Sequence, residues 1–186
     1  MKPLLSAITL LFFCMGAAAP QATKGGPVAP PAGKKGPSRP ASGRPANLAQ
    51  LMRGTLFPAS NVVFFAQNDD PAKVAPGKDQ SLATDPLANT YGKWQAVENA
   101  ALSIVEVADL LSLPGRKCLN GKSAPIQNAD WLKFVQGLRE AGMTAYKAAQ
   151  SKNQDTIVDA SGTLSEACAH CHERYRDKGE VADRCQ

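Results

Sequence analysis

The chain has 186 residues, of which 44% are hydrophobic, and this composition suits a folded domain rather than a disordered chain. Its formal net charge of +5 is unevenly distributed, because all 16 acidic residues follow residue 45. The same stretch has 15 Lys and Arg, so its formal charge is only 15 − 16 = −1. A basic surface for nucleic acid is therefore not expected, and the sequence predicts no nucleic-acid partner.

Residues 1–19 have the three parts of a secretory signal peptide. Lys2 precedes an apolar run over residues 4–15, and small residues follow over 16–19. The apolar run is too short to span a bilayer, so no transmembrane span is predicted. We therefore expect an exported, periplasmic protein from which this segment, with Cys14, is removed.

Residues 20–45 have a different composition, with seven Pro, five Gly, five Lys or Arg and no acidic residue. Such a segment cannot bury a hydrophobic core, and its prolines and positive charge favour an extended, disordered linker. The folded domain is expected to occupy residues 46–186, which is long enough for a single core.

The first predicted helix covers about residues 46–67, with a kink at Pro58 because a proline removes one backbone hydrogen bond. Residues 62–65 also fit a short strand, since they are β-branched and aromatic, but no partner strand is visible elsewhere. Apolar or small residues recur at helical spacing. They are Leu48, Met52, Thr55, Ala59, Val62 and Ala66.

Three more helices are predicted downstream. Asp85-Pro86 predicts the start of the second, whose buried stripe runs over residues 91–113. The third is expected to open at Asn128 or Asp130, and the fourth to cover about residues 155–175. Because no strand-rich segment is present, the expected fold is all-α, an antiparallel up-down-up-down four-helix bundle.

The fourth predicted helix carries Cys168-Ala169-His170-Cys171-His172, a C-x-x-C-H motif typical of covalent haem attachment. Two cysteines at this spacing lie on one helix face, so both can add to the vinyl groups of one porphyrin. The adjacent His172 can then bind the iron. The motif predicts one covalently bound haem c on a C-terminal haem-attachment helix, with His172 as the proximal metal ligand.

Two other kinds of site use a C-x-x-C pair. A zinc site would need Cys118, Cys185 or His170 to complete four ligands, but no second close pair of ligands is present. A thioredoxin-like redox pair normally follows a strand in a βαβ unit, and no such unit is predicted nearby. Both alternatives are therefore less favoured than haem attachment.

The longer motif Cys-x-x-Cys-His-x-x-Tyr-Arg, from Cys168 to Arg176, resembles that of cytochrome c′ and its Met-ligated low-spin relatives. The resemblance covers residues 46–176, although only the terminal motif is specific. It implies a periplasmic four-helix cytochrome with Arg176 near the haem propionates and with redox partner proteins in the periplasm or at its membrane. The basic linker and the additional cysteines depart from the family pattern, which leaves homodimerisation and partner choice open.

The sixth iron position decides what such a haem does, because an electron carrier fills it and an open site can take a gas. The resemblance implies Met52 as this second metal ligand, whereas Met143 is expected to be packing. The other interpretation is that Met52 only fills core space. A pocket around Leu51, Thr55 and Leu56 would then bind nitric oxide or carbon monoxide. Electron transfer is the preferred prediction and gas binding the alternative.

No enzyme activity is expected, because no second histidine from elsewhere in the chain and no pair of carboxylates adjoins the motif to act as acid or base. The remaining cysteines, Cys118 and Cys185, follow the second and fourth predicted helices, whose ends lie at the same pole of an antiparallel bundle. We expect them to form a disulfide in an exported protein. Two free or intermolecular thiols are the alternative.

Overall fold

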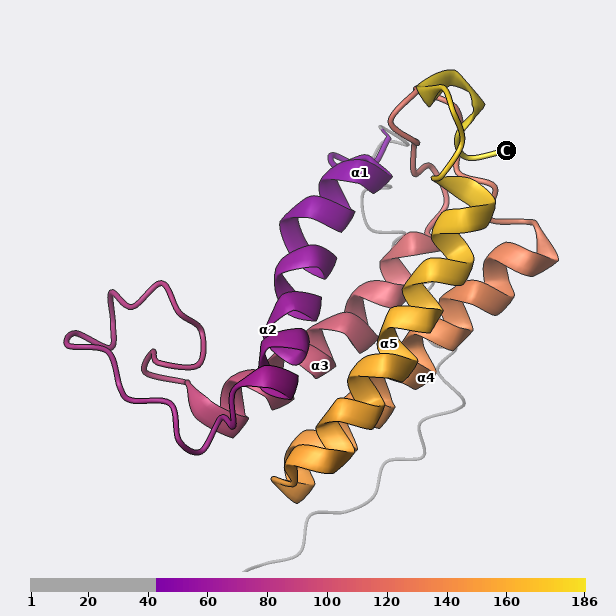
Figure 1. The fold of residues 1–186 in the computed structure, drawn as a ribbon. Coiled ribbons are helices and arrows are strands. Elements are labelled where there is room, and N and C mark those ends of the chain that lie inside the picture. The colour runs from indigo at the N-terminus through magenta and orange to yellow at the C-terminus, as the bar shows by residue number, and fades with distance from the viewer. Residues whose placement is uncertain (1–42) are drawn as a thin grey trace, which may run out of the picture. The chain divides into compact units, whose positions relative to one another are not determined.

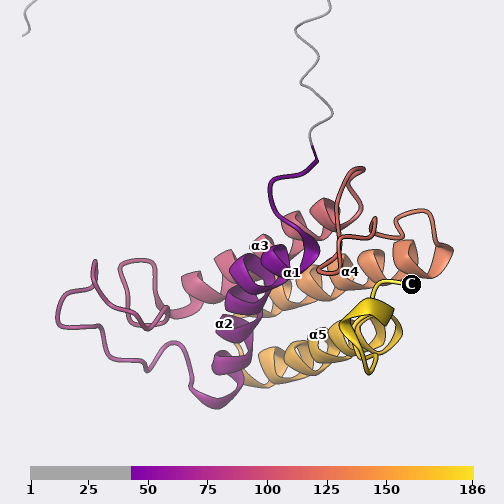
Figure 2. The same cartoon turned by 90° about the horizontal axis from the view of Figure 1, so that it is seen from above.

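A computed structural model describes residues 43–186, and these form a four-helix bundle without a strand-built sheet (Figure 1). The predicted signal peptide and residues 20–42 of the predicted linker lie outside the described residues. Consecutive helices run in alternating directions and pack as neighbours, and the first also contacts the last (Figure 2). The predicted fold class is therefore confirmed. None of the helices described here is long and apolar enough to cross a membrane.

The first helix of the bundle is continuous but changes type along its length. It comprises α1 (Leu48–Leu51), the π-helical segment η1 (Met52–Leu56) and α2 (Phe57–Asn68). A capping box starts it, because the Asn47 side chain accepts a hydrogen bond from the Gln50 N–H and the Gln50 side chain accepts one from the Asn47 N–H. This local cap fixes where the helix begins.

The π-helical segment ends at Leu56, two residues before Pro58, which has no backbone N–H to donate. At its end the Phe57 N–H donates to the Met52 carbonyl, five residues back instead of four. A widened turn therefore lies next to the place where the sequence predicted a kink. Residues 62–65 are helical, so the preference for helix over strand is confirmed.

The widened turn also rotates the buried face of the helix. Buried positions step from Leu51 to Leu56 and afterwards continue at ordinary helical spacing through Val63. The predicted stripe is therefore correct at Leu48, Ala59 and Ala66. It is wrong by one residue at Met52, Thr55 and Val62, because Leu51, Leu56 and Val63 are buried instead. The step of five residues from Leu51 to Leu56 coincides with the widened turn.

The second bundle helix, α3 (Lys93–Leu111), begins later than predicted. Asp85 does not cap it, because its carboxylate accepts the Leu87 N–H at 2.9 Å and closes a turn instead. The turns continue to Gly92, where a Cβ would stand 2.2 Å from the Leu87 carbonyl oxygen. Only glycine fits there, so the chain enters α3 from a tight turn.

The last two helices, α4 (Ala129–Ser151) and α5 (Gln154–Tyr175), agree with the prediction. Asn128 precedes α4, and the Asn153 side chain caps α5 by accepting the Thr156 N–H at 3.1 Å. The connection between the two helices is residues 152–153 alone. So short a connection forces α4 and α5 to be antiparallel neighbours.

Gly142 of α4 lies at a close approach to α3. A Cβ at this position would stand 2.9 Å from Val105 Cγ2 and 3.4 Å from the Ala101 carbonyl oxygen. Both neighbouring residues are buried and have little room to move. The absent side chain therefore lets the two helices pack closely.

Gly142→Val is expected to overpack this contact and to lower the free energy of unfolding by about 1–3 kcal/mol. Gly137→Ala is the matched control on the same helix, because nothing lies within 4 Å of a Cβ there. It should instead stabilise by up to about 1 kcal/mol, since alanine favours helix. Urea unfolding of both variants measures the difference, and equal effects would contradict the packing argument.

Candidate functional site

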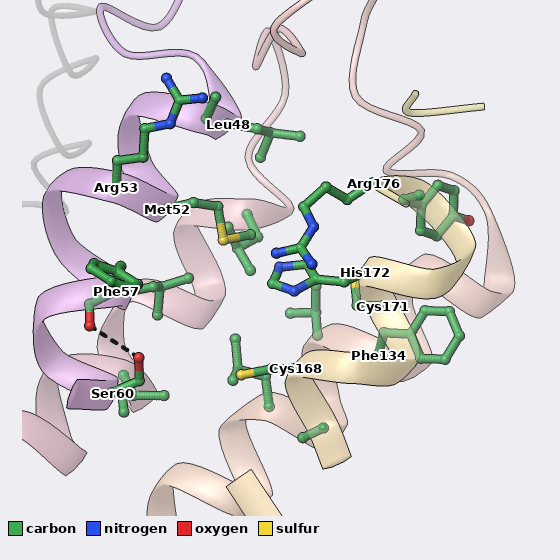
Figure 3. A pocket seen from close by; sticks show the side chains of 18 of the residues that line it. Leu48, Met52, Arg53, Phe57, Ser60, Phe134, Cys168, Cys171, His172 and Arg176 are labelled. Atoms are coloured by element: carbon green, nitrogen blue, oxygen red, sulfur yellow. Dashed lines mark hydrogen bonds between the residues drawn. The ribbon is translucent and has the colours of Figure 1, made fainter. Parts of the chain in front are cut away.

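A cavity of about 490 Å³ lies between the first helix, α4 and α5. Its volume falls in the range of about 300–1,000 Å³ that is typical of small-molecule sites. Figure 3 shows side chains of the first helix facing those of the C-x-x-C-H motif across this space. Most of the wall is apolar, and it includes Leu48, Leu56, Phe64, Phe134, Leu138 and Leu164.

Cys168, Cys171 and His172 all line this cavity from the last turns of α5 (Figure 3). Both cysteines are free and partly buried. The helical spacing predicted from the sequence therefore brings two thiols and an imidazole to one apolar space. His170, between them in the motif, is exposed and is not part of the wall.

Burial shifts the pKa of Cys168, Cys171 and His172. It raises the pKa of Cys168, and burial together with the neighbouring Cys168 raises the pKa of Cys171 to about 11. Burial, followed by the positive charge of Arg176, lowers the pKa of His172. At neutral pH the cavity thus holds two protonated thiols and a neutral imidazole. The neutral form of an imidazole is the one that binds metals.

Met52 approaches the cavity from the opposite wall. Figure 3 shows its thioether side chain pointing across the space toward His172 and Arg176. It is the first residue of the π-helical segment. Met143 does not line the cavity and is partly buried on α4. The two methionines therefore differ in position, Met52 at the cavity and Met143 away from it.

The predicted wall around Met52 is only partly correct. Leu56 lines the cavity, whereas Leu51 and Thr55 do not. Arg53 and Phe57 of the first helix line it instead. Four of these residues, Arg53, Thr55, Leu56 and Phe57, lie in or directly after the π-helical segment, where the number of residues per turn differs from that of an α-helix.

The charged side chains that line the cavity are all arginines. They are Arg53, Arg176 and Arg184, and no acidic side chain is part of the wall. Arg176, predicted from the motif, lies over the cavity beside His172 and also pairs with Asp177 at 2.6 Å (Figure 3). An apolar space with a positively charged rim suits a ligand that combines an apolar body with carboxylates.

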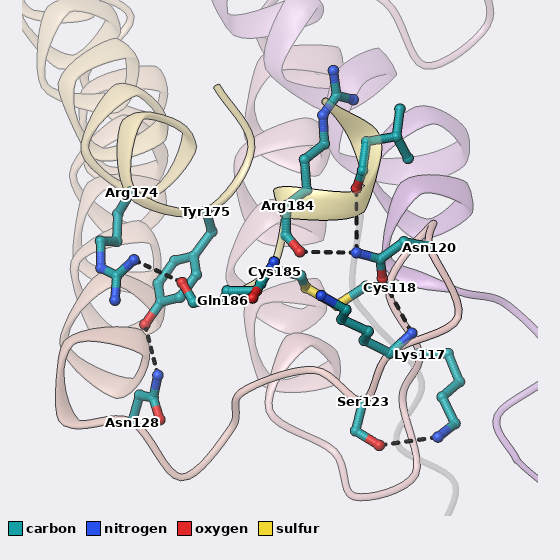
Figure 4. Close-up of a disulfide and its surroundings, with 12 residues drawn as sticks. Lys117, Cys118, Asn120, Ser123, Asn128, Arg174, Tyr175, Arg184, Cys185 and Gln186 are labelled. Carbon is teal, nitrogen blue, oxygen red and sulfur yellow. Dashed lines mark hydrogen bonds between the residues drawn. A yellow bond between two sulfur atoms is a disulfide. The ribbon is translucent and has the colours of Figure 1, made fainter. Parts of the chain in front are cut away.

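Cys118 and Cys185 form a disulfide, as predicted, with their Cα atoms 6.3 Å apart (Figure 4). Both cysteines also line the cavity, so the bridge forms part of its wall. The alternative of two free thiols is therefore wrong, and a zinc site using this pair loses those ligands. Within residues 43–186, no three His, Cys, Asp or Glu side chains are grouped as they would be around a metal ion.

Tyr175, in the last turn of α5, connects the cavity wall to α4. Its hydroxyl donates to Asp130 Oδ1 at 2.5 Å, and its ring meets the Trp131 ring edge to face at 5.0 Å between centroids. Arg174 binds Asp130 from outside at 3.1 Å. Arg174 is not part of the cavity wall, and its ion pair joins the end of α5 to the start of α4.

The Tyr175 hydroxyl, with the Trp131 backbone N–H and Arg174, holds the pKa of Asp130 below its usual range. Such a carboxyl stabilises the fold above its unfolded pKa of about 3.9, and the contribution is lost as pH falls through the lower folded pKa. Tyr175→Phe should therefore lower the melting temperature near neutral pH. The difference from the wild type should shrink as pH falls below about 4.

Thermal unfolding over a pH series measures this effect. Tyr146→Phe is the control, because Tyr146 also lies on the bundle but only accepts a hydrogen bond from the Gln150 amide. It should give a difference that does not depend on pH. If the difference in melting temperature between Tyr175→Phe and the wild type did not depend on pH, the ionisation of Asp130 would not contribute to the effect of Tyr175.

Comparisons with known protein families, curated proteins and solved structures found no match to this chain. The resemblance to cytochrome c′ therefore remains a proposal that rests on the motif, the helical fold and the cavity.

Proposed function

We propose that this chain is a monohaem c-type cytochrome that transfers electrons. The observation that carries the proposal is that Cys168, Cys171 and His172 meet on one apolar cavity of ligand size. The two thiols would hold the porphyrin edge through thioether bonds, and His172 would be the proximal ligand. The bound haem would supply an iron centre that takes up and releases one electron.

The groups around the cavity fit such a cofactor. The neutral imidazole of His172 can bind iron without first losing a proton. The aromatic and aliphatic wall would exclude water from the ring, and burial of this kind is one of the factors that set a haem potential. Arg176 at the rim would offer its guanidinium to a propionate.

Met52 supports electron transfer over gas binding, because its thioether points into the cavity opposite His172. A Met and His pair is a ligand set that raises the reduction potential of cytochromes c. Gas binding remains the second candidate. Gas binding would follow if Met52 only packed against the porphyrin ring. The apolar wall beside Met52 would then leave the sixth coordination position of the iron open.

Export and redox partners belong to the same proposal. The Cys118–Cys185 bridge supports an oxidising compartment, where disulfides form and persist. We propose that the protein is located in the periplasm and that its partner is a periplasmic or membrane-associated redox protein. We also propose that it is not an enzyme.

Optical spectra of the purified holoprotein, ferric and ferrous, with and without carbon monoxide, test the function. We expect a low-spin wild type that is indifferent to carbon monoxide, and a high-spin Met52→Ala variant that binds it. Met143→Ala is the matched control and should resemble the wild type. A high-spin wild type that binds carbon monoxide and ignores Met52→Ala would favour gas binding, and a protein purified without haem would contradict both candidates.

A further inference from the structure

We infer that Arg184 is a further haem-binding residue, held at the cavity by the Cys118–Cys185 bridge so that its guanidinium faces a carboxylate of the bound haem. The inference rests on the proposed function and deepens it. It concerns a residue outside the C-x-x-C-H-x-x-Y-R motif, in the C-terminal segment after α5.

The backbone on either side of the Arg184 side chain is fixed. The next residue, Cys185, is bonded to Cys118, and its N–H donates to the Tyr175 carbonyl at 2.8 Å. The Asn120 amide donates to the Arg184 carbonyl at 2.9 Å (Figure 4). One disulfide and two hydrogen bonds thus hold the irregular segment at Arg184 and Cys185 against the cavity.

The charge of Arg184 has no ion-pair partner among residues 43–186, although Arg174 and Arg176 each have one. Its Nε is buried and makes no hydrogen bond within the described part of the chain. Its positive charge contributes to the lowered pKa of Asp177, but that carboxylate already pairs with Arg176. A buried donor without a partner is costly, and a carboxylate in the cavity would offset this cost.

The cavity itself also favours an anionic ligand at this place. Because no acidic side chain lines it, nothing within its wall competes for the guanidinium. Hydrogen bonds between a guanidinium and a carboxylate are strong, since both groups are charged. Arg176 and Arg184 could therefore each take one carboxylate of the same ligand.

A positive charge beside a haem favours the reduced iron, which carries one positive charge less than the oxidised iron. Arg184→Gln should therefore lower the reduction potential of the holoprotein. We expect a change of up to about tenfold in the one-electron equilibrium constant, or about 59 mV. Arg184→Lys, which keeps the charge, should restore most of the wild-type potential.

The role of the bridge gives a second readout. Cys118→Ser with Cys185→Ser frees the segment, so it should lower the potential in the same direction as Arg184→Gln. Combined with Arg184→Gln, the bridge variant should add little, because the charge it positions is already absent. Independent, additive shifts would mean that the bridge does not act through Arg184.

Spectroelectrochemical titration of these holoproteins is the experiment, with Arg174→Gln as the matched control. That variant loses the same charge near the same segment, but Arg174 is outside the cavity wall and pairs with Asp130. A haem-loaded Arg184→Gln whose potential matches that of Arg174→Gln overturns the inference and leaves the proposed function intact. Failure of the wild type to bind haem would instead overturn the proposed function.

If Arg184→Gln does not fold, the bridge variant decides alone. A haem-loaded Cys118→Ser, Cys185→Ser protein with the wild-type potential also overturns the inference, because Arg184 would then contribute nothing that depends on its tether.

Discussion

Replacing Cys168 and Cys171 together by alanine should abolish covalent haem attachment completely. The two thiols are the free cysteines of the described chain, and both line the cavity. Without them no thioether bond can form, so the denatured variant should have the mass of its polypeptide alone. Mass spectrometry under denaturing conditions measures this, with the wild type expected to carry one haem.

The second cysteine pair supplies the control for this experiment. Cys118→Ser with Cys185→Ser removes two other cysteines that touch the same cavity, yet it should leave attachment intact. Within the motif, His172→Ala should remove the proximal ligand, whereas His170→Ala changes an exposed residue and should have no effect. Haem that stays covalently bound after loss of Cys168 and Cys171 would contradict the proposed attachment site.

Removing the bridge should lower the free energy of unfolding by about 4 kcal/mol in the chain-entropy model. The bridge joins positions 67 residues apart, and this long closed loop restricts the unfolded chain. Domains of this size have only about 5–15 kcal/mol in total, so the loss would be a large part of the stability.

Guanidinium unfolding of the wild type and of Cys118→Ser, Cys185→Ser, both loaded with haem, measures this loss. Arg174→Gln is a useful comparison, because it loosens the same pole by breaking an exposed ion pair and should cost at most about 1 kcal/mol. A bridge variant that is no less stable than Arg174→Gln would contradict the prediction. The haem content of the bridge variant tests attachment through Cys168 and Cys171, whereas its stability tests the Cys118–Cys185 bridge. The two results are therefore independent.

The helical fold and the bridge could be predicted because their signals are local or topological. The helical spacing of apolar residues and the capping residues predicted α4 and α5. The antiparallel order of the helices predicted that Cys118 and Cys185 lie at the same end of the bundle. The start of α3 was missed because Asp85 before a proline fits a turn as well as a helix cap. The close approach at Gly92 that decides between them exists only in three dimensions.

The wall of the cavity could be predicted less well. A helical repeat assumes a constant number of residues per turn, and the π-helical segment at Met52–Leu56 violates that assumption. Arg184 had no signal at all, because it lies in no helix. It follows the short turn Val181–Asp183 and is placed by the bond between its neighbour Cys185 and Cys118. The grouping of Cys168, Cys171 and His172 on one cavity could be predicted, because it depends on spacing within one helix.

The bridge has a consequence for biosynthesis, since Cys168 and Cys171 lie between its two halves in the sequence. Four cysteines can form two bridges in three ways, and each way occupies both attachment thiols. Maturation of the proposed cytochrome would therefore require an oxidation that stops after one bond. Burial would favour such a stop, because it raises the pKa of Cys171 to about 11 and thiol–disulfide exchange proceeds through the thiolate. We therefore expect a chain that folds early to keep the thiols of Cys168 and Cys171 reduced, whereas a chain that stays unfolded would expose them to oxidation.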